Sequence, residues 1–410
     1  MLHSGRARAR IPGGQHLPSG GVVVTGESEF SIPDALLPAD GRFGCGPAKV
    51  RPEQVSALAR RAADFLGTSC RRGAVRGLVG RIRTGLAELF ALPEGYQVVL
   101  GNGGATAFWN IATYGLIRER AQHLSFGEFS ARFASVDRHT PWLAEPSVLE
   151  CAAGRYPEPR AERGVDAYAL THNETSTGVV MPVRRVPGAD DDALVLVDGT
   201  SAAGGLPVVP EEFDVYYFAP QKCFGADGGL WVALMSPAAV ARAERLVADG
   251  RYVPEFFSLP VAIEHSARDL VFNTPSVSGL FLFAEQIEWL LGIGGLDAAA
   301  SRARKSASVL YGWAEAARWA APFVAEPGCR SPLVATIEFA PHIDAARLVA
   351  GLRAHGIVDL EPHRKFGHNQ VRVGLFPAIE TADVEALVAC VEHAVEQLGR
   401  AAGRGRRSDV

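Results

Sequence analysis

The chain has 410 residues, of which 48% are hydrophobic and 21% charged, with six cysteines and a formal net charge of −4. Its length predicts two domains, and its composition is that of a well-packed soluble globular protein. The slightly negative charge gives no support to nucleic acid or an anionic membrane as a partner, and the scattered cysteines, which form no CxxC pair, argue against a zinc site and predict reduced thiols.

The chain begins with a basic segment rich in Gly and Pro, and we expect residues 1–37 to form a disordered extension. The apolar run at 22–24 is too short for the core of a signal peptide. No apolar run in the chain approaches the roughly 20 residues that span a bilayer. These features together predict a cytoplasmic protein.

Helix and strand signals then alternate as far as residue 296. Helices are predicted at 52–67, behind a proline in the first turn, and at 75–91. Several strand-like runs are apolar at consecutive positions, as expected of strands covered on both faces of a sheet. The pattern predicts a large α/β domain over 38–296 with a mostly parallel sheet. Its expected strands are 96–101, 167–173, 193–199, 215–219 and 230–235, and a long helix is expected at 276–293.

The pattern changes after residue 296. A helix at 297–319 is followed by two strand-like runs, each of which precedes a further helix. These elements predict a smaller α+β domain over 297–400 and a flexible tail at 401–410. The strand-like runs are 333–340 and 370–376, and the helices after them are 344–355 and 382–398.

Lys222 is one of only four lysines in a chain that has 41 basic side chains. It stands between the apolar runs VYYFAP and GGLWVALM, whereas the other three lysines lie in polar surroundings. Lysine lowers its pKa when it is desolvated, whereas arginine cannot readily give up its proton. Lys222 is therefore a candidate for a group that works as a neutral amine.

Asp198 ends the run ALVLVD and precedes GTSAAGG, where a predicted strand meets a loop. Open α/β sheets bind ligands at this edge. An aspartate there can pair with the cationic ring nitrogen of pyridoxal phosphate, a cofactor that also requires a lysine, and Lys222 follows in the sequence. This spacing alone leaves open that Asp198 is a turn residue or a helix cap.

Three further stretches carry polar groups or glycines next to predicted strands and helices. GNGGATAF, at 101–108, opens a helix whose free amides could bind a phosphate, although such a glycine turn is often only structural. HNETSTG, at 172–178, places Thr175 where a hydroxyl could bond the cofactor's phenolic oxygen. FNTP, at 272–275, could supply Asn273 and Thr274 to a phosphate.

The whole set of motifs resembles the phosphoserine aminotransferases of the actinobacterial type, in the class V aminotransferase family of fold-type I pyridoxal-phosphate enzymes. The resemblance runs in order through residues 40–398 and rests on FGCGPAKV, TSCRRGAVRGLVGR, LGNGGATAFWN, FGEFSARF, HNETSTG, VDGTSAAGG, APQKCFGADGGLW, FNTP and NQVRVGLFPA. It implies the fold-type I architecture, which has a mostly parallel sheet in a large domain and a smaller α+β C-terminal domain. It also implies pyridoxal 5'-phosphate as cofactor and no metal.

The resemblance implies a role for each matching cofactor residue. Lys222 would join the cofactor through an imine, and Asp198 would keep the pyridine nitrogen protonated. Phe129, which could equally be a core aromatic, would stack on the ring. The remaining contacts implied are Thr175 to the ring oxygen and Gly104, Ala105 and Gln221 to the phosphate.

The resemblance also implies a homodimer with shared active sites, because Asn273 and Thr274 would reach the phosphate in the neighbouring subunit. Arg372 would pair bidentately with the substrate α-carboxylate, a geometry that suits the guanidinium. Arg71 would bind substrate near the entrance of the site. These substrate arginines depend on the motif match, because a lone arginine is usually only solvated.

Two positions depart from the family pattern. Cys70 stands where the family usually has histidine, and His368 stands where it commonly has arginine. Both positions are expected to bind the substrate phosphate, so His368 is predicted to contact it and the anion pocket looks less basic than usual.

The implied reaction transfers the amino group of glutamate to 3-phosphooxypyruvate and yields O-phosphoserine and 2-oxoglutarate, in serine biosynthesis. The sequence leaves open whether the related substrate of pyridoxine biosynthesis is also used. An alternative is a paralogous aminotransferase for another acidic 2-oxo acid, such as a phosphonate or a sulfonate. A non-catalytic binding module is a further alternative, against which the pair of Lys222 and Asp198 speaks.

Overall fold

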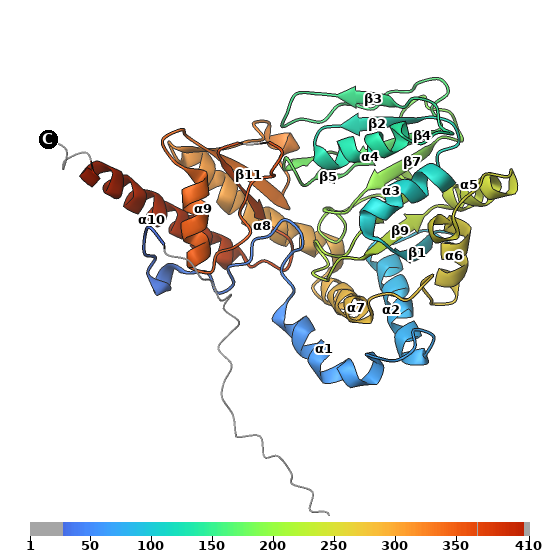
Figure 1. Ribbon diagram of the computed structural model, residues 1–410, viewed down its shortest axis with the longest axis horizontal. Helices are drawn as coiled ribbons and strands as arrows, with labels where there is room; N and C mark the ends of the chain where they lie inside the picture. The colour runs from blue at the N-terminus through green and yellow to red at the C-terminus, as the bar shows by residue number, and fades with distance from the viewer. Residues whose placement is uncertain (1–27, 367, 406–410) are drawn as a thin grey trace, which may run out of the picture.

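The computed structural model describes residues 28–366 and 368–405. Residues 1–27, which make up most of the predicted disordered extension, lie outside this range, as do residues 406–410 of the predicted tail. The chain forms a large α/β body and a smaller α+β body that lie side by side (Figure 1).

Ten α-helices are found in the described part of the chain: α1 (Pro52–Phe65), α2 (Gly73–Leu89), α3 (Gly104–Gly115), α4 (Glu128–Arg138), α5 (Pro237–Ala248), α6 (Leu259–Ala267), α7 (Val277–Gly292), α8 (Gly295–Ala316), α9 (Ala345–Ala354) and α10 (Thr381–Gly405). Its strands are β1 (Gln97–Asn102), β2 (Ala121–Ser125), β3 (Ser147–Glu150), β4 (Ala167–Thr171), β5 (Asn173–Glu174), β6 (Val179–Val180), β7 (Leu194–Asp198), β8 (Val215–Phe218), β9 (Leu230–Met235), β10 (Ala320–Pro322), β11 (Val334–Phe339) and β12 (Gln370–Gly374).

The large body is built on a seven-stranded sheet in the order β1-β9-β8-β7-β4-β2-β3. Strands β8, β7, β4, β2 and β3 run parallel, and β9 pairs antiparallel with both β8 and β1. The prediction of a mostly parallel sheet is confirmed.

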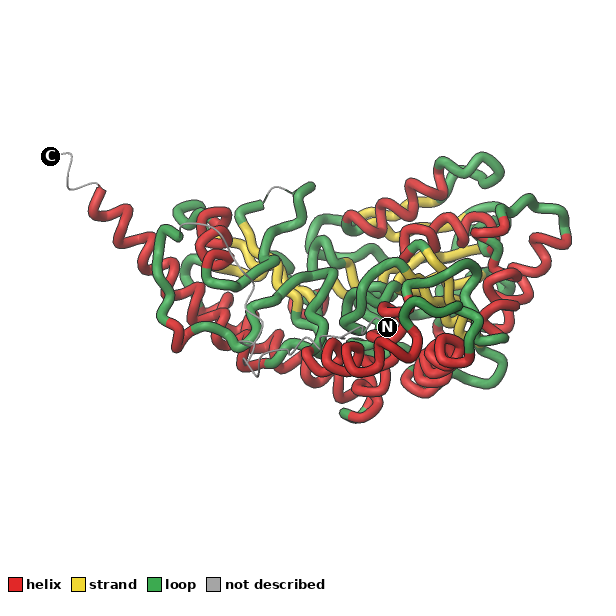
Figure 2. Tube along the Cα trace, turned by 60° about the horizontal axis from the view of Figure 1, so that its bottom comes forward, coloured by secondary structure: helices red, strands yellow, loops and turns green. Residues whose placement is uncertain are grey.

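Both faces of this sheet are covered by helices (Figure 2). Val98 and Leu100 pack into the core shared with α2 and α7, whereas Val99 between them packs into the core shared with α3 and α6. All three side chains are buried. Burial on both faces explains why the strands are apolar at consecutive positions rather than alternating.

The smaller body packs three helices, α8, α9 and α10, with the antiparallel sheet β10-β11-β12. The predicted domain boundary at 296/297 falls in the first turn of α8. Helix α10 runs to Gly405 and so continues past the predicted start of a flexible tail at 401.

The segment 28–43 belongs to the smaller body, which the sequence did not predict. Phe30, Ile32 and Phe43 are buried in the core of that body, and the Ile32 amide donates to His355 Nε2 at 3.2 Å. The expectation of disorder is therefore wrong for residues 28–37, and the predicted N-terminal limit of the large domain at 38 is also wrong. This segment has a low propensity for helix or strand, but its apolar side chains are ordered because they pack against a distant part of the chain.

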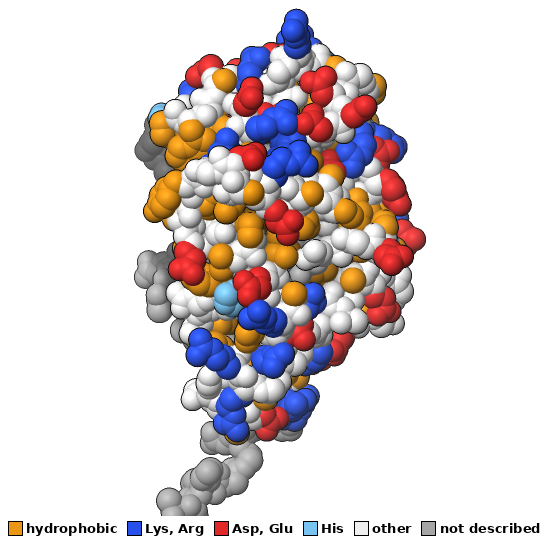
Figure 3. Space-filling view, turned by 90° about the vertical axis from the view of Figure 1, so that its right-hand side faces the viewer, with side chains coloured by type: hydrophobic (Ala, Val, Ile, Leu, Met, Phe, Trp, Pro, Cys, Tyr) orange, Lys and Arg blue, Asp and Glu red, His pale blue; other side chains and the backbone are white. Residues whose placement is uncertain are grey.

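The cysteines, the helix hydrophobicity, the possible metal ligands and the surface charge of the described chain all bear on function. All six cysteines are free thiols. No single helix between residues 28 and 405 is long and apolar enough to cross a membrane, although the bent pair α7 and α8 passes by length and composition. Within the same range no group of three or more His, Cys, Asp or Glu side chains is placed to hold a metal ion. Acidic and basic side chains are interspersed over the face seen in Figure 3.

Candidate active site

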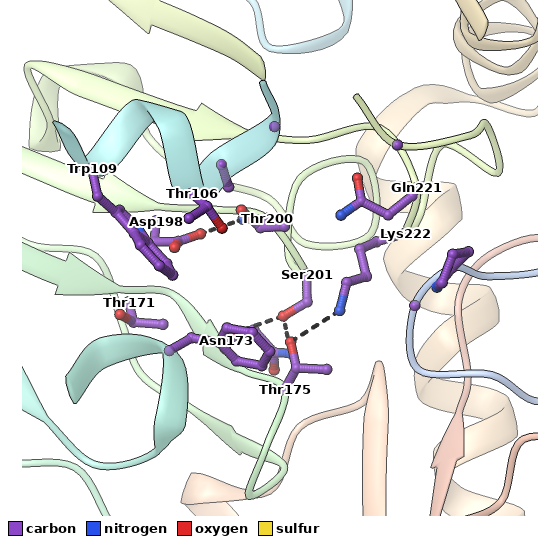
Figure 4. A pocket seen from close by; sticks show the side chains of 16 residues that line it. Thr106, Trp109, Thr171, Asn173, Thr175, Asp198, Thr200, Ser201, Gln221 and Lys222 are labelled. Carbon is purple, nitrogen blue, oxygen red and sulfur yellow. Dashed lines mark hydrogen bonds between the residues drawn. The ribbon is translucent and has the colours of Figure 1, made fainter. Parts of the chain in front are cut away.

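A cavity of about 340 Å³ lies at the carboxyl ends of the central parallel strands. It includes seven of the residues predicted from the sequence, namely Gly104, Ala105, Phe129, Thr175, Asp198, Gln221 and Lys222. They come from β7, the first turns of α3 and α4, and the loops after β5 and β8 (Figure 4). The crossover connections of the α/β sheet bring them together, which is why residues far apart in sequence meet here.

Lys222 follows β8 and points its amine into this cavity, with only 8% of the residue exposed. Its Nζ donates to the Cys45 carbonyl at 2.6 Å and to Thr175 Oγ1 at 3.4 Å. Burial is the largest cause that lowers its pKa, to about 8 from an ordinary 10.5, and the nearby Arg372 acts in the same direction. The neutral amine expected from the sequence is therefore favoured by the site itself.

The stem of Lys222 lies against Gly46, a residue that sequence reasoning did not single out. A Cβ at Gly46 would lie 2.3 Å from Lys222 Cε, and the residue has a φ of +130°. Only glycine fits both the space and the backbone conformation. The one signal in the sequence was the motif FGCGPAKV, which contributed to the family resemblance.

Asp198 ends β7 and is buried at the wall of the cavity. Its Oδ1 accepts the Thr200 amide at 2.9 Å. Burial raises the pKa of the Asp198 carboxyl, and the hydrogen bond from the Thr200 amide opposes that rise. A buried carboxylate of this kind is stabilised by a cationic partner in the cavity, which is the charge that a protonated pyridine ring carries.

The first turn of α3 offers backbone amides to the same cavity. Gly103 and Gly104 have φ values of 115° and 68°, and no heavy atom in the described chain lies within 4 Å of a Cβ built on Gly104. No side chain among residues 28–405 caps this end of the helix. Free amides and the positive end of the helix dipole favour an anion such as a phosphate.

Two buried polar atoms beside this turn also lack a hydrogen-bond partner in the described part of the chain. The Thr200 hydroxyl makes no hydrogen bond and Gln221 Oε1 accepts none within the described part of the chain, and both residues line the cavity. Leaving buried polar atoms unpaired costs about 1–3 kcal/mol each. An amine, a buried carboxylate and an uncapped helix end with orphaned polar atoms fit the three binding needs of pyridoxal phosphate. Thr200 was missed by sequence reasoning, although it follows Asp198 in the motif VDGTS.

Phe129 lines the cavity and also packs, partly buried, against the core around α3. Lys222 Nζ is 5.7 Å from the centroid of its ring, and the ring of His363 approaches it edge-on at 6.1 Å. The ring is therefore placed to cover one face of a planar ligand, which is the alternative that the family resemblance favoured.

Arg372 is a residue of the smaller body that lies beside the cavity. It lies on β12, and its Nη1 donates to the Thr175 carbonyl at 3.1 Å. Its Nε is buried and, as far as the described residues go, has no partner. A guanidinium with an unused donor beside the cavity is suited to a carboxylate.

His368 does not line the cavity in the described part of the chain, so its predicted contact with the substrate phosphate gains no support here. Its Nδ1 pairs with Glu338 Oε1 at 3.2 Å, and its ring packs on Phe323 at 5.2 Å. His363, five residues earlier, is also absent from the lining of the cavity, but its ring lies against Phe129, which does line it. Its Nδ1 is buried and unpartnered within the described chain, and burial followed by the charge of Arg372 lowers its pKa. Sequence proximity alone could not decide which histidine of this loop turns inward.

Arg71, Asn273 and Thr274 are exposed in the single chain and do not line its cavity. Asn102, the last residue of β1, donates through Nδ2 to the Phe272 carbonyl at 3.0 Å and so holds the FNTP segment beside the start of α3. Cys70 is half-buried against the large-domain core.

Comparison with known proteins agrees with the geometry. The sequence model described as Aminotransferase class-V matches residues 161–387. A curated phosphoserine aminotransferase from Nocardioides sp. is 57% identical over 370 residues, which make up 90% of this chain and 99% of the relative.

Solved structures of the same kind share the fold. The phosphoserine aminotransferase from Cytophaga hutchinsonii has a TM-score of 0.78 at 22% identity and covers 86% of this chain and 99% of its own. The PLP-bound phosphoserine aminotransferase from Trichomonas vaginalis has a TM-score of 0.74 at 18% identity, with coverage of 86% and 99%.

The predicted architecture of a fold-type I pyridoxal-phosphate transferase is thereby confirmed. The family model spans more than half of the chain, and the Nocardioides relative is similar along nine-tenths of it. The chain is a class-V aminotransferase and belongs to the phosphoserine aminotransferase family.

Proposed function

We propose that this chain transfers the amino group of glutamate to 3-phosphooxypyruvate and produces O-phosphoserine and 2-oxoglutarate, reversibly, as a step of serine biosynthesis. The observation that carries the proposal is the buried Lys222 amine, whose pKa is lowered to about 8 in the same cavity as Asp198. The names and identities of the curated relatives support the substrate.

Pyridoxal 5'-phosphate is the cofactor of this proposal. Lys222 would hold it covalently, Asp198 would pair with its ring nitrogen, and Phe129 would cover the ring. Thr175 would bond its ring oxygen, and the amides of Gly104 and Ala105, together with the side chains of Gln221 and Thr200, would hold its phosphate. When bound, pyridoxal phosphate supplies an electron-withdrawing ring that takes up the electron pair left when a Cα–H bond breaks.

Proton transfer falls to Lys222. A neutral amine at Nζ can take the proton from Cα of the amino donor and would pass it to the bound cofactor. In the second half of the reaction the same amine would move a proton from the cofactor to Cα of the acceptor. The lowered pKa of Lys222 keeps a usable fraction of that amine neutral near physiological pH. Asp198, as a fixed anion, stabilises the positive ring nitrogen through both transfers.

The substrate end of the cavity would be formed by the smaller body. Arg372 has a buried, unused Nε for the α-carboxylate, judged over the described residues. The imidazole of His363, which lies against Phe129, would supply a donor for the phosphate in place of His368. Arg71 is exposed, so in our proposal it would act on a site other than the cavity of its own chain.

A homodimer with shared sites is part of the proposal. Asn273 and Thr274 are exposed next to the start of α3, and from there they would bind the phosphate in the partner's cavity. A cytoplasmic location, expected from the sequence, stays a prediction.

A substrate panel tests the proposal. Purified protein with glutamate as donor should use the phosphorylated three-carbon 2-oxo acid far better than its phosphonate, sulfonate and non-phosphorylated analogues. Cys70, where the family usually has a basic residue, is the feature that favours the alternative. A preference for the phosphonate or sulfonate acid would replace the proposed substrate and keep the reaction class, and the four-carbon phosphorylated acid in the same panel decides on a role in pyridoxine biosynthesis.

A further inference from the structure

Two helices, α3 and α4, begin at the wall of the cavity, and they differ in whether a side chain caps the N-terminus. The first turn of α3 has no side-chain cap among the residues that the structure describes. The first turn of α4, which carries Phe129, is filled by the carboxylate of Glu174 from β5. Both helix ends have the free amides and the positive dipole that attract an anion. Without Glu174 they would therefore be two competing binding places for the same anionic group of a ligand.

Glu174 is completely buried, with 0% of the residue exposed. Its Oε1 accepts the Ser176 hydroxyl at 2.7 Å, the Ser176 amide at 3.1 Å and the Phe129 amide at 3.4 Å. Its Oε2 accepts the amide and the hydroxyl of Ser130, both at 3.0 Å. In the described part of the chain these hydrogen-bond partners are all amides and hydroxyls, so the charge of this carboxylate is offset by the helix end.

The Glu174 side chain lies close against the backbone that precedes α4. Gly127 precedes α4, and a Cβ there would lie 2.3 Å from Glu174 Cγ. Ser176 Oγ also accepts the Glu128 amide at 2.9 Å, so three successive amides of the first turn are tied to this one segment. Strand β5 is itself fixed by antiparallel pairing of Glu174 with Val179.

The same short segment forms another part of the cavity. Thr175, the next residue, contacts Lys222 Nζ through its hydroxyl. The Phe129 amide and Lys222 Nζ are thus linked through the buried carboxylate of Glu174 and the peptide unit that joins it to Thr175.

We propose that Glu174 is a positioning residue with two effects on cofactor binding. It holds Phe129 level with the ring of the cofactor. It also occupies the N-terminus of α4 as an internal anion, so that only the N-terminus of α3 is free to bind the cofactor phosphate at this wall of the cavity. The inference rests on the proposed function, since it concerns how this chain binds pyridoxal phosphate.

The test compares cofactor binding in Glu174→Gln with a matched control. In Glu174→Gln the amide nitrogen faces donors, so part of the first turn of α4 loses its acceptor. Asp166→Asn is the control, because Asp166 is also a buried carboxylate that accepts backbone amides, those of Arg118, Glu119 and Arg120, away from the cavity. Asp166 differs from Glu174 in that it also pairs with the Arg242 guanidinium at 3.0 Å, which makes its replacement the more severe test of a general effect of losing a buried carboxylate. Full-length protein freed of cofactor is titrated with pyridoxal phosphate, and uptake is followed by the induced circular dichroism of the bound cofactor.

We expect Glu174→Gln to raise the Kd for pyridoxal phosphate about tenfold and to change the dichroic band, and Asp166→Asn to leave both unchanged. In a Phe129→Leu background, Glu174→Gln should add less than about threefold, because part of its effect acts through that ring. Ser176→Ala, a milder change of the same network, should shift the Kd in the same direction and covers the case that Glu174→Gln does not fold.

Hydrogen exchange provides a readout that needs no cofactor. The amides of Phe129 and Ser130 should exchange faster in Ser176→Ala and Glu174→Gln than in wild type or Asp166→Asn. Unchanged affinity and exchange in the variants, or an equal effect of Glu174→Gln with and without Phe129, would overturn the inference while wild type still binds and turns over. Wild-type protein that takes up no pyridoxal phosphate would instead overturn the proposed function, and the inference with it.

Discussion

At the scale of single residues, burial pushes the two ionisable groups of the cavity toward their neutral forms. It lowers the pKa of Lys222 to about 8 and raises the pKa of Asp198 above its ordinary 3.8. Each shift costs stability while the group is charged, because the unfolded chain favours the charged form more strongly. A bound cofactor that consumes the amine and supplies a cationic ring nitrogen offsets both costs, which ties cofactor binding to folding.

Lys222→Met should therefore abolish transamination and yet stabilise the cofactor-free protein at pH 7. The folded-state pKa of about 8 lies below the ordinary 10.5, so the penalty is full below pH 8 and disappears as pH rises through 10.5. Relief of this penalty is worth roughly 3 kcal/mol, and the Cys45 carbonyl loses a donor worth about 1 kcal/mol, which leaves a gain of about 2 kcal/mol.

Urea unfolding of the cofactor-free proteins at pH 7 and near pH 10.5 measures this gain. It should be present at the lower pH and be lost at the higher one. A methionine variant that is less stable than wild type at pH 7 would show that burial of the Lys222 charge costs no stability. A variant that retains turnover would show that Lys222 is not essential.

The two histidines of the loop before β12 should behave differently. His363→Ala is expected to raise KM for the phosphorylated acid several-fold, about 1 kcal/mol, because it removes a donor beside Phe129, which lines the cavity. His368→Ala is the control, and it should leave KM unchanged, since His368 pairs with Glu338 away from the cavity. Steady-state kinetics with glutamate held constant measures both, and an effect confined to His368→Ala would reverse the assignment.

At the scale of elements, the site depends on backbone that leaves room for side chains from elsewhere. The loop around Gly46 shows this most directly, because its missing Cβ is the space that the Lys222 stem occupies. Gly67 offers a comparison, since its φ is also left-handed, at +72°, but no described atom lies within 4 Å of a Cβ there.

Gly46→Ala should lower kcat by about 100-fold or more, because it displaces the amine from its reacting position. Gly67→Ala should cost about 1 kcal/mol of stability through backbone strain alone and leave kcat near wild type. Thermal unfolding and single-turnover rates of the two variants separate strain from displacement. Equal kinetic effects of both changes would mean that the space at Gly46 has no special role.

Element boundaries were well predicted where periodicity was strong. The strand at 230–235 and the helix at 276–293 agree with β9 and α7 to within a residue at each end. Strands β2 and β3 were not predicted, and the predicted strand at 167–173 divides into β4 and β5. The break after Thr171 is where the chain leaves the sheet to form the cavity wall, a decision made by tertiary contacts rather than by local propensity.

At the scale of the whole molecule, the segment after β4 joins the two bodies. Thr336 Oγ1 donates to the Thr177 carbonyl at 2.8 Å, the Ser331 amide donates to the Gly178 carbonyl at 2.9 Å, and Arg372 donates to the Thr175 carbonyl. Lys365 forms an ion pair with Glu128 at the start of α4 at 2.6 Å. The cavity is thus shaped by both bodies, although each of them has a core of its own.

Shared sites in a dimer can be tested by mixing inactive subunits. Lys222→Ala removes the amine from its own chain, and Asn273→Ala is expected to weaken phosphate binding in the partner's cavity. A hybrid dimer should regain one competent site, so refolded mixtures should recover up to about a quarter of wild-type activity under random pairing. Light scattering at the assay concentration provides the control, and an active monomer or a mixture without recovery would contradict a shared site.

The sequence by itself determined the mostly parallel α/β fold, the class of enzyme and seven residues of the cavity, including Lys222 and Asp198. Consecutive apolar strands and a lysine confined between them are local patterns, and the resemblance of the ordered motifs to a known family supplied the class of enzyme and the remaining residues. Only the tertiary structure decided that residues 28–43 belong to the smaller body, that Gly46 makes room for Lys222, and that His363 rather than His368 lies against Phe129. These outcomes depend on burial and on contacts between segments hundreds of residues apart, and local sequence does not record which side chain a distant segment will meet.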